Sequence, residues 1–311
     1  MLGVWRLGVG TLEVLRSLVD RQLRLAYIAW VMVCVVWGTT YLGIRIALET
    51  IPPMLVGGLR FTVAGALLVV VLRLRGQPLP PPREWSGLAM LGCLMLGIGN
   101  GGVVWAEQTV PSGIAAVLVA AQPFWITGVE ATLADGERMT RRMLGGLLVG
   151  FAGIVILVWP DLTARGELKS GFVLGVIATQ LACLGWSIGS SSSKRRPAEE
   201  NAIMASALQM IFGGAGLLVV GTIRGEWSDL GFTPRSLAAE LYLVAVGSWA
   251  GYSAYIYALK HLPISTVMLY SYINPVIAVL LGTLVLDEPF GARVIIASAL
   301  VLAGVAIVRR K

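Results

Sequence analysis

Ten runs of hydrophobic residues follow one another along this chain, each close to the roughly 20 residues that a helix needs to cross a bilayer. Polar and charged residues lie mainly in the short stretches between the runs. This pattern predicts an all-α integral membrane protein with ten transmembrane helices and no inserted soluble domain. The expected helices cover residues 26–47, 54–74, 86–106, 112–133, 142–159, 171–190, 202–222, 238–259, 264–286 and 292–308.

The first 25 residues precede the hydrophobic runs. Glu13, Arg16, Asp20 and Arg24 recur at steps of three or four residues, so they share one face of a helix. The segment is equally consistent with a short amphipathic helix on the inner membrane surface and with a disordered extension. No small-residue cleavage site follows an apolar core, so a cleaved signal peptide is not expected.

The second half of the chain repeats features of the first half at a nearly constant spacing. A shift of 152 residues aligns four pairs of positions: Trp105 with Tyr257, Pro111 with Pro263, Gln122 with Asn274, and Pro123 with Pro275. Internal repeats of this kind predict two structural units of five helices each. The expected units are residues 26–159 and 171–309, preceded by the extension 1–25.

The basic residues predict how the chain is oriented in the membrane. If the N-terminus is cytoplasmic, 17 Lys and Arg residues fall on the inner side and five on the outer side, with Arg45 and Arg60 inside helices. Basic residues favour the cytoplasmic side, so both termini are expected there. Because each unit has an odd number of helices, the two units are expected to be inverted copies of each other.

The composition agrees with a membrane protein, since 57% of the residues are hydrophobic and 13% are charged, against roughly 25% charged in soluble domains. The net charge of +7 does not indicate nucleic-acid binding, because the basic residues sit in short loops. The single histidine, His261, lies in an expected loop, and the three cysteines show no pairing pattern. No metal, cofactor or catalytic centre is therefore expected.

The chain carries several short motifs in a definite order, some of them at paired positions in the two halves. They are Trp37-Gly-Thr-Thr-Tyr41, Leu59-Arg60-Phe61, Ser112-Gly-Ile-Ala-Ala116, Gly136-Glu137, Trp186-Ser187, Tyr257-Ala-Leu259, Pro263-Ile-Ser265, Asn274-Pro275-Val276 and Leu286-Asp-Glu288. Through these motifs, residues 26–309 resemble the EamA family of the drug/metabolite transporter superfamily. One departure is Trp105-Ala-Glu107, where the family usually has Tyr-x-x-Ala-Leu. The resemblance implies a carrier of the cytoplasmic (inner) membrane for small organic metabolites, commonly amino acids or related compounds, often moved outward.

Two prolines inside expected helices are the first candidates for a substrate site. Pro123 and Pro275 each follow an amide side chain, Gln122 and Asn274, at matched positions of the two halves. A proline removes one backbone donor and displaces the carbonyl four residues earlier, which in lipid needs a partner or a polar cavity. We expect both kinked helices to face a central cavity. The alternative is a packing kink that a neighbouring helix satisfies.

Arg60 is a charge that lies deep in the expected helix 54–74. Such a cation is costly in the membrane and marks a functional site by default. It could contact a carboxylate or phosphate of the substrate, or it could pair with Glu107 or a backbone carbonyl. No Asp, Glu or His is expected at the membrane midplane, so any ion coupling would use Glu107 or Glu130, which could equally serve in structural pairing.

Aromatic and amide side chains complete the expected cavity. Trp37 and Trp186 occupy matched positions in the two halves, and Asn100 lies in a glycine-rich stretch that permits close helix approach or local unwinding. Ordinary helix packing is the alternative for each of them. The remaining candidates for substrate binding or gating are Tyr41, Tyr252 and Tyr270.

These features predict a secondary transporter that works by alternating access, and not an enzyme. The expected partners are a small-molecule substrate and membrane lipids. The small-residue faces Gly146–Gly150 and Ala299–Ala303 are expected to pack helices together, in a monomer or a homodimer. The alternatives are a nucleotide-sugar or drug-type carrier of the same superfamily, an integral membrane enzyme acting on lipid-linked substrates, and a channel.

Overall fold

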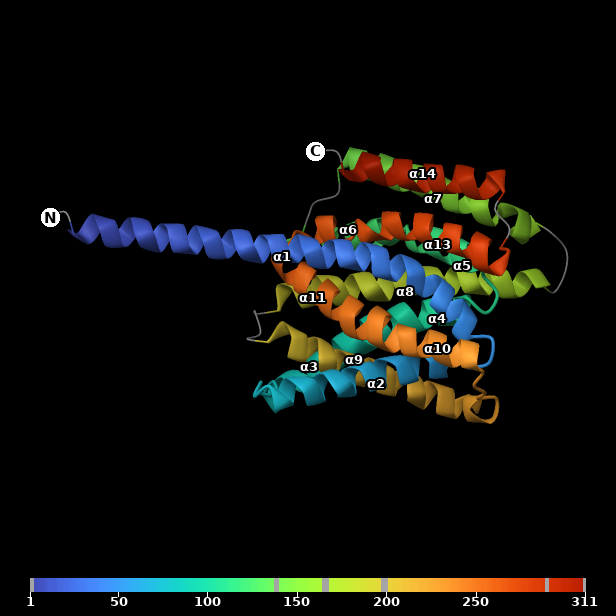
Figure 1. Ribbon diagram of the computed structural model, residues 1–311. Helices are drawn as coiled ribbons and strands as arrows, with labels where there is room; N and C mark the ends of the chain where they lie inside the picture. Colours follow the sequence, from blue (N-terminus) through green and yellow to red (C-terminus); the bar gives the residue numbers. More distant parts are fainter. Residues whose placement is uncertain (1–2, 137–139, 164–167, 197–200, 289–290, 310–311) are drawn as a thin grey trace.

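The computed structural model describes residues 3–136, 140–163, 168–196, 201–288 and 291–309, and within these ranges every regular element is a helix. Figure 1 shows the helices running roughly side by side in one bundle. The first of them, α1 (Gly3–Ala47), continues without a break through the N-terminal extension and projects beyond the bundle (Figure 1). The prediction of an all-helical membrane protein is therefore confirmed for the described residues.

Seven helices in the described part of the chain are long and apolar enough to cross a membrane. Their bounds are Asp20–Ala47, Pro53–Leu74, Pro82–Ala106, Ser112–Ala131, Gly171–Arg195, Ala202–Ile223 and Ile264–Leu286. Three further hydrophobic runs fall on other helices. These are α7 (Arg141–Thr163), the continuous helix from Pro234 to His261, and α14 (Ala292–Arg309).

The helices pack in a pattern that joins the two halves of the chain. From the first half, α1 packs against α11 (Gly251–His261) and α13 (Tyr270–Leu286). From the second half, α8 (Leu168–Arg195) packs against the corresponding segments of the first half. These segments are η1 (Cys93–Asn100), α4 (Gly101–Ala106), α5 (Ser112–Val119) and α6 (Gln122–Ala131). Likewise α2 (Pro53–Leu74) lies along α9 (Ala202–Ile223). The two halves therefore share one core instead of forming two separate domains.

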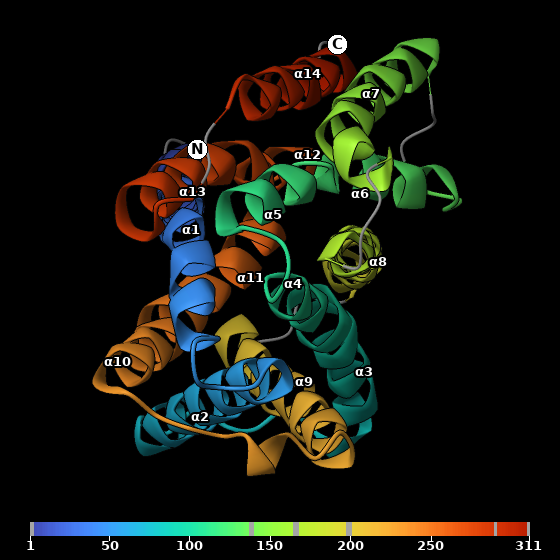
Figure 2. The same cartoon turned by 90° about the vertical axis from the view of Figure 1, so that its right-hand side faces the viewer.

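The pair α7 and α14 lies at one edge of the bundle (Figure 2). Their contact is made through glycine: a Cβ atom on Gly304 would lie 2.5 Å from the carbonyl oxygen of Gly146 and 2.5 Å from the nitrogen of Gly150. Only a residue without a side chain allows this backbone approach. The predicted Gly146–Gly150 face is thus used, whereas Ala299 and Ala303 are exposed and the partner position is Gly304.

The helix expected at 112–133 is broken, not merely kinked. It consists of α5 (Ser112–Val119) and α6 (Gln122–Ala131), with a turn at Ala120 and Ala121. Pro123 therefore lies in the first turn of α6, where its missing N–H leaves no helical hydrogen bond unmade.

In the second half the break comes earlier relative to the proline. The short helix α12 (Ile264–Val267) ends before α13, and Pro275 stands inside α13. The matched prolines therefore have different local geometry. We expected a kink at both prolines, but the chain is interrupted just before Pro123 and is a continuous helix around Pro275.

Two stretches of π-helix occur at corresponding places in the two halves. The first, η1 (Cys93–Asn100), lies between α3 (Pro82–Gly92) and α4 (Gly101–Ala106). The second, η3 (Leu243–Ala250), lies between α10 (Pro234–Tyr242) and α11. π-Helical turns are rare and are frequently found at functional sites.

Candidate substrate cavity

A cavity of about 60 Å³ lies at the centre of the bundle, between helices of both halves. Residues of α1, α2, η1, α4, α5, α6, α8, η3, α11 and α13 line it. Nine of the eleven residues predicted for substrate binding or gating are among its lining residues: Trp37, Tyr41, Arg60, Asn100, Gln122, Trp186, Tyr252, Tyr270 and Asn274. The structure thus brings together residues that are more than 200 positions apart in sequence.

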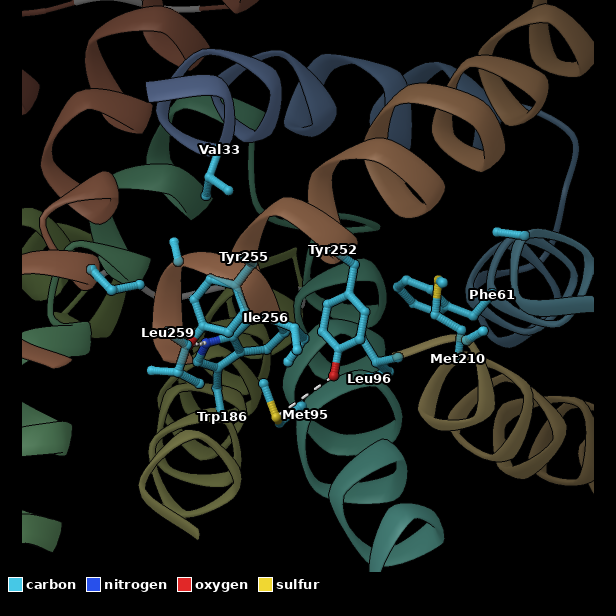
Figure 3. Close-up of a cluster of buried hydrophobic side chains, with 14 of the residues drawn as sticks. Val33, Phe61, Met95, Leu96, Trp186, Met210, Tyr252, Tyr255, Ile256 and Leu259 are labelled. Atoms are coloured by element: carbon cyan, nitrogen blue, oxygen red, sulfur yellow. Dashed lines mark hydrogen bonds between the residues drawn. The ribbon is translucent and has the colours of Figure 1, made fainter. Parts of the chain in front are cut away.

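Aromatic rings form one wall of this cavity. Trp37 lies at the centre of the group, with its ring centroid 5.3 Å from that of Trp186, 5.1 Å from Tyr255 and 5.0 Å from Tyr270. Figure 3 shows Tyr255 and Tyr252 next to each other on α11, with the ring of Trp186 from α8 beside Tyr255. Such contacts at 4.5–7 Å stabilise fixed ring positions, so the wall is rigid and largely apolar.

Hydrogen bonds hold the polar ends of these rings. The hydroxyl of Tyr255 accepts from Trp186 Nε1 at 3.1 Å and lies 2.7 Å from Ser190 Oγ. The hydroxyl of Tyr252 donates to Gln209 Oε1 at 2.5 Å. These polar groups have protein partners, so the wall offers the cavity mainly ring faces.

The two matched amides bind equivalent backbone atoms. Gln122 Nε2 donates to the carbonyl oxygen of Cys183 at 2.9 Å and to Ser187 Oγ at 2.5 Å. The side-chain nitrogen of Asn274, oriented toward α1, donates to the carbonyl oxygen of Cys34 at 2.9 Å. Cys34 and Cys183 are 149 positions apart, as are Trp37 and Trp186. The two amides therefore tie α6 to α8 and α13 to α1 while they line the cavity.

Arg60 brings a cation into the cavity with an incomplete set of partners. Its side chain is 2% exposed, and its Nε donates to Ser248 Oγ at 2.6 Å. The guanidinium carbon lies 4.7 Å from the ring centroid of Phe61. Its Nη1 has no hydrogen-bond partner among the residues that the structure describes. Because arginine stays charged, this buried N–H favours an anionic group beside it.

The π-helix η3 makes room for this cation and receives a tryptophan. A Cβ atom on Gly247 would lie 2.9 Å from Arg60 Nη2, so a larger residue there would force the guanidinium to move. The carbonyl oxygen of Gly247 accepts a hydrogen bond from Trp37 Nε1 at 3.1 Å. The π-helix therefore positions both the cation and one ring of the aromatic wall.

The remaining predicted residues lie outside the cavity lining. Pro275 lines a separate apolar pocket toward α14, and Pro123 is buried in α6 beside Gln122. Glu107 is 0% exposed at the end of α4, and Arg45 donates to its backbone carbonyl. Its carboxylate has no hydrogen-bond partner in the described part of the chain, so a direct bond to Arg60 is not formed.

Glu130 forms an ion pair near the end of α6. Arg195 Nη1 lies 2.7 Å from its Oε1, and Ser191 Oγ donates to the same oxygen at 2.6 Å. Arg195 also binds Asp135 in the following loop, and this hydrogen bond lowers the pKa of that carboxyl group. The geometry gives Glu130 a structural partner outside the cavity.

Two residues beside Arg60 were missed by sequence reasoning. Ser248 binds its Nε, and Glu240 on α10 is 5% exposed and interacts with its charge. An acidic residue inside the expected helix 238–259 was the available signal, because buried acids in membrane helices are usually functional. Glu240 is the third residue of that run, so it was taken for a residue at the membrane surface.

A helical membrane protein with a charged interior cavity shared by both halves has the architecture of a membrane transporter. The chain belongs to the EamA-like transporter family, whose sequence model matches residues 24–159 and again residues 173–310.

Two curated relatives and one solved structure extend this match. The chain is 36% identical over 264 residues to the inner membrane transporter YedA of Escherichia coli (strain K12), covering 85% of this chain and 83% of YedA. It is 24% identical over 277 residues to the transporter YvbV of Bacillus subtilis (strain 168), covering 89% of each chain. A crystal structure with 23% identity shares the fold with a TM-score of 0.66, covering 91% of this chain and 97% of its own. The protein is therefore a multi-pass membrane transporter of the cell membrane.

Proposed function

We propose that this protein is a secondary transporter that moves small organic metabolites, amino acids or related compounds, out of the cell by alternating access. In this proposal ten helices form two inverted five-helix repeats, residues 26–159 and 171–309, with both termini in the cytoplasm. The contacts of α1 and α8 with corresponding segments of the opposite half support this arrangement. The excess of basic residues on one side supports the orientation.

The observation that carries the proposal is Arg60 in the central cavity. Its unpartnered Nη1 favours a carboxylate, and the wall around Trp37 and Trp186 favours an apolar or aromatic side chain. A small metabolite that joins a carboxylate to an apolar group matches both surfaces. Amino acids and related acids are compounds of this kind.

The size of the cavity supports a cycle of conformations. A volume of about 60 Å³ holds only a few water molecules, since each needs roughly 10–15 Å³. An amino acid therefore fits only when the helices around the cavity move apart. The broken helix at Ala120 and Ala121 and the π-helices η1 and η3 are the places where such movement requires least loss of regular hydrogen bonding.

The test is transport by the purified protein in liposomes loaded with a panel of labelled amino acids, nucleotide sugars and cationic drugs. We expect release of one or more amino acids, and we expect Arg60→Gln to abolish it. Arg73→Gln is the matched control, because Arg73 lies on the same helix but is exposed. Release of nucleotide sugars or drugs alone would contradict the substrate class. Absence of transport across the panel would contradict the function.

A further inference from the structure

Two helix ends in this structure lack the same backbone hydrogen bond, and a proline is the reason at each. In an α-helix the carbonyl oxygen of one residue accepts from the N–H group four residues later. The fourth residue after Glu107 is Pro111, and the fourth after Leu259 is Pro263. Proline has no N–H group, so the carbonyl oxygens of Glu107 and Leu259 cannot have this partner. The two sites are 152 positions apart, so they are equivalent places in the two halves.

A basic side chain supplies the missing donor at each of these helix ends. Arg45, in the last turn of α1, donates from Nη1 to the carbonyl oxygen of Glu107. Lys194, in the last turn of α8, donates from Nζ to the carbonyl oxygens of Leu259 at 2.6 Å and Leu262 at 2.8 Å. Arg45 and Lys194 are 149 positions apart, the same spacing that relates the two tryptophans of the aromatic wall. Because an unpartnered carbonyl is costly in a membrane, each contact stabilises the helix end that it caps.

The two contacts lie at opposite ends of the bundle, and each is just beyond the central cavity. Figure 1 shows α1 ending at the right of the bundle and α11 ending at the left. Arg45 lies about one helical turn beyond Tyr41, and Lys194 lies about two turns beyond Trp186. Tyr41 and Trp186 line the cavity, and the partner helices α4 and α11 contribute lining residues as well. Each contact therefore joins two cavity-lining helices on one side of the cavity.

We propose that Arg45 and Lys194 are the two gate residues of the transport cycle. The contact of Arg45 with Glu107 closes the cavity toward the outside, and the contact of Lys194 with Leu259 closes it toward the cytoplasm. This proposal rests on the transport function and the orientation proposed above, and it adds the residues that gate the cavity.

Both contacts are formed in this structure, in which the cavity of about 60 Å³ is too small for an amino acid. Opening one side separates a cation from its carbonyl oxygen, and both groups then need water as a partner. Water reaches them only on the side that opens, while the contact on the other side stays formed. The inverted relation of the two halves makes the two openings equivalent steps that occur in turn.

The thiol of Cys183 can report which side is open. Cys183 lines the cavity and is 2% exposed, and with Cys34→Ala and Cys93→Ala it is the single cysteine of the chain. The experiment measures how fast it reacts with sulfonatoethyl methanethiosulfonate, a charged reagent that does not cross membranes. Intact cells give the rate from outside, and inside-out membrane vesicles give the rate from the cytoplasmic side. This parent protein should react slowly from both sides.

Loss of either contact should open one side only. Arg45→Met should raise the rate from outside about tenfold, the change expected when one hydrogen bond from a charged group is lost. Lys194→Met should raise the rate from the cytoplasmic side by a similar factor. In the double variant the two effects oppose each other, so the ratio of the two rates should return toward the parent value.

The matched controls keep a cation or change one elsewhere. Arg45→Lys and Lys194→Arg retain a donor for the carbonyl oxygen, so both should react like the parent. Arg73→Gln removes an exposed basic residue that caps neither helix end, and it should also react like the parent.

Several results would overturn the proposal. They are no faster reaction in either methionine variant, a faster reaction from the same side in both, or an equal increase from both sides, which a merely structural role would produce. A tenfold increase in Arg45→Lys or Lys194→Arg would also contradict it, because the donor is retained. Fast reaction of the parent from both sides would contradict it without any substitution at Arg45 or Lys194, so this test does not depend on how the variants fold.

These outcomes are separate from a failure of the proposed function. None of the measurements uses a transported solute, whereas the function is judged by transport of the labelled panel. If Arg45→Met opened the cytoplasmic side and Lys194→Met the outer side, the proposed orientation would be wrong, and the pair of gates would be supported.

Discussion

The guanidinium of Arg60 occupies space that any side chain at position 247 would fill. A Cβ atom on Gly247 would lie 2.9 Å from Arg60 Nη2 and 2.9 Å from Thr40 Cγ2. Contacts this short force at least one of these groups to move. The cation that we assign to solute binding is therefore held in place by a backbone position, in addition to the hydroxyl of Ser248.

This close contact predicts the effect of one added methyl group. Gly247→Ala should displace the guanidinium and weaken binding of amino acids about tenfold, equivalent to ~1.4 kcal/mol. Gly128→Ala is the control, because no atom lies within 4 Å of the added Cβ there. Binding to both purified variants, measured by tryptophan fluorescence, checks the prediction. Equal affinities would contradict the assigned position of Arg60.

At the residue scale, the sequence alone predicted many of the residues that line the cavity but few of the hydrogen bonds that they form. Matched positions and the cost of polar groups in lipid were sufficient to select Gln122, Asn274 and Arg60. The partners of these residues were beyond prediction, because Cys34, Cys183 and Ser248 offer ordinary backbone or hydroxyl groups. Which carbonyl lies beside which amide depends on how the helices pack, and a hydrophobic run contains no signal for that.

At the scale of helices, two end caps connect segments that are far apart in sequence. Glu288, which follows α13, accepts hydrogen bonds from Ser112 N at 2.8 Å, Ser112 Oγ at 2.9 Å and Gly113 N at 3.0 Å. Glu226 accepts from Met54 N at 2.9 Å at the start of α2. A carboxylate is favoured at a helix N-terminus, where backbone N–H groups lack helical partners. Glu288 thereby fixes the end of α13 to the start of α5.

The contact between Glu288 and Ser112 can be measured as a coupling energy. We expect Glu288→Ala to lower the free energy of unfolding by about 1.5–3 kcal/mol, because hydrogen bonds to a charged group are lost. In a double-mutant cycle with Ser112→Ala the two effects should not add, with a coupling of at least about 0.5 kcal/mol. Glu49→Ala is the control, since its ion pair with Arg235 is exposed and contributes about 0–1 kcal/mol. Strict additivity would contradict the contact.

The hydrophobic pattern predicted where helices lie but not how they are interrupted. Pro123 and Pro275 indicated local disturbance, yet one stands just after a break and the other inside a continuous helix. The π-helices η1 and η3 were not predicted, although glycines near Asn100 suggested local unwinding. A π-turn shifts the backbone register by one residue, and the periodicity of an almost uniformly apolar segment is too weak to reveal that shift.

At the scale of the whole molecule, the resemblance of the two halves and the family membership both indicate a membrane transporter. The central cavity is lined from both halves, so relative movement of the halves changes its shape and its access. In the alternating access that we propose, one site is exposed in turn to the two sides of the membrane. A channel, by contrast, would keep a continuous path and would not need the solute to bind before each crossing.

The most direct test of this account is exchange across the membrane of proteoliposomes. Vesicles are loaded with the labelled amino acid that the panel identifies, and the same unlabelled amino acid is then added outside. The account predicts that outside solute accelerates release of the label in a saturable way, in the wild type and in Arg73→Gln but not in Arg60→Gln. Release that rises linearly with concentration, ignores the outside solute and survives in Arg60→Gln would contradict alternating access around Arg60.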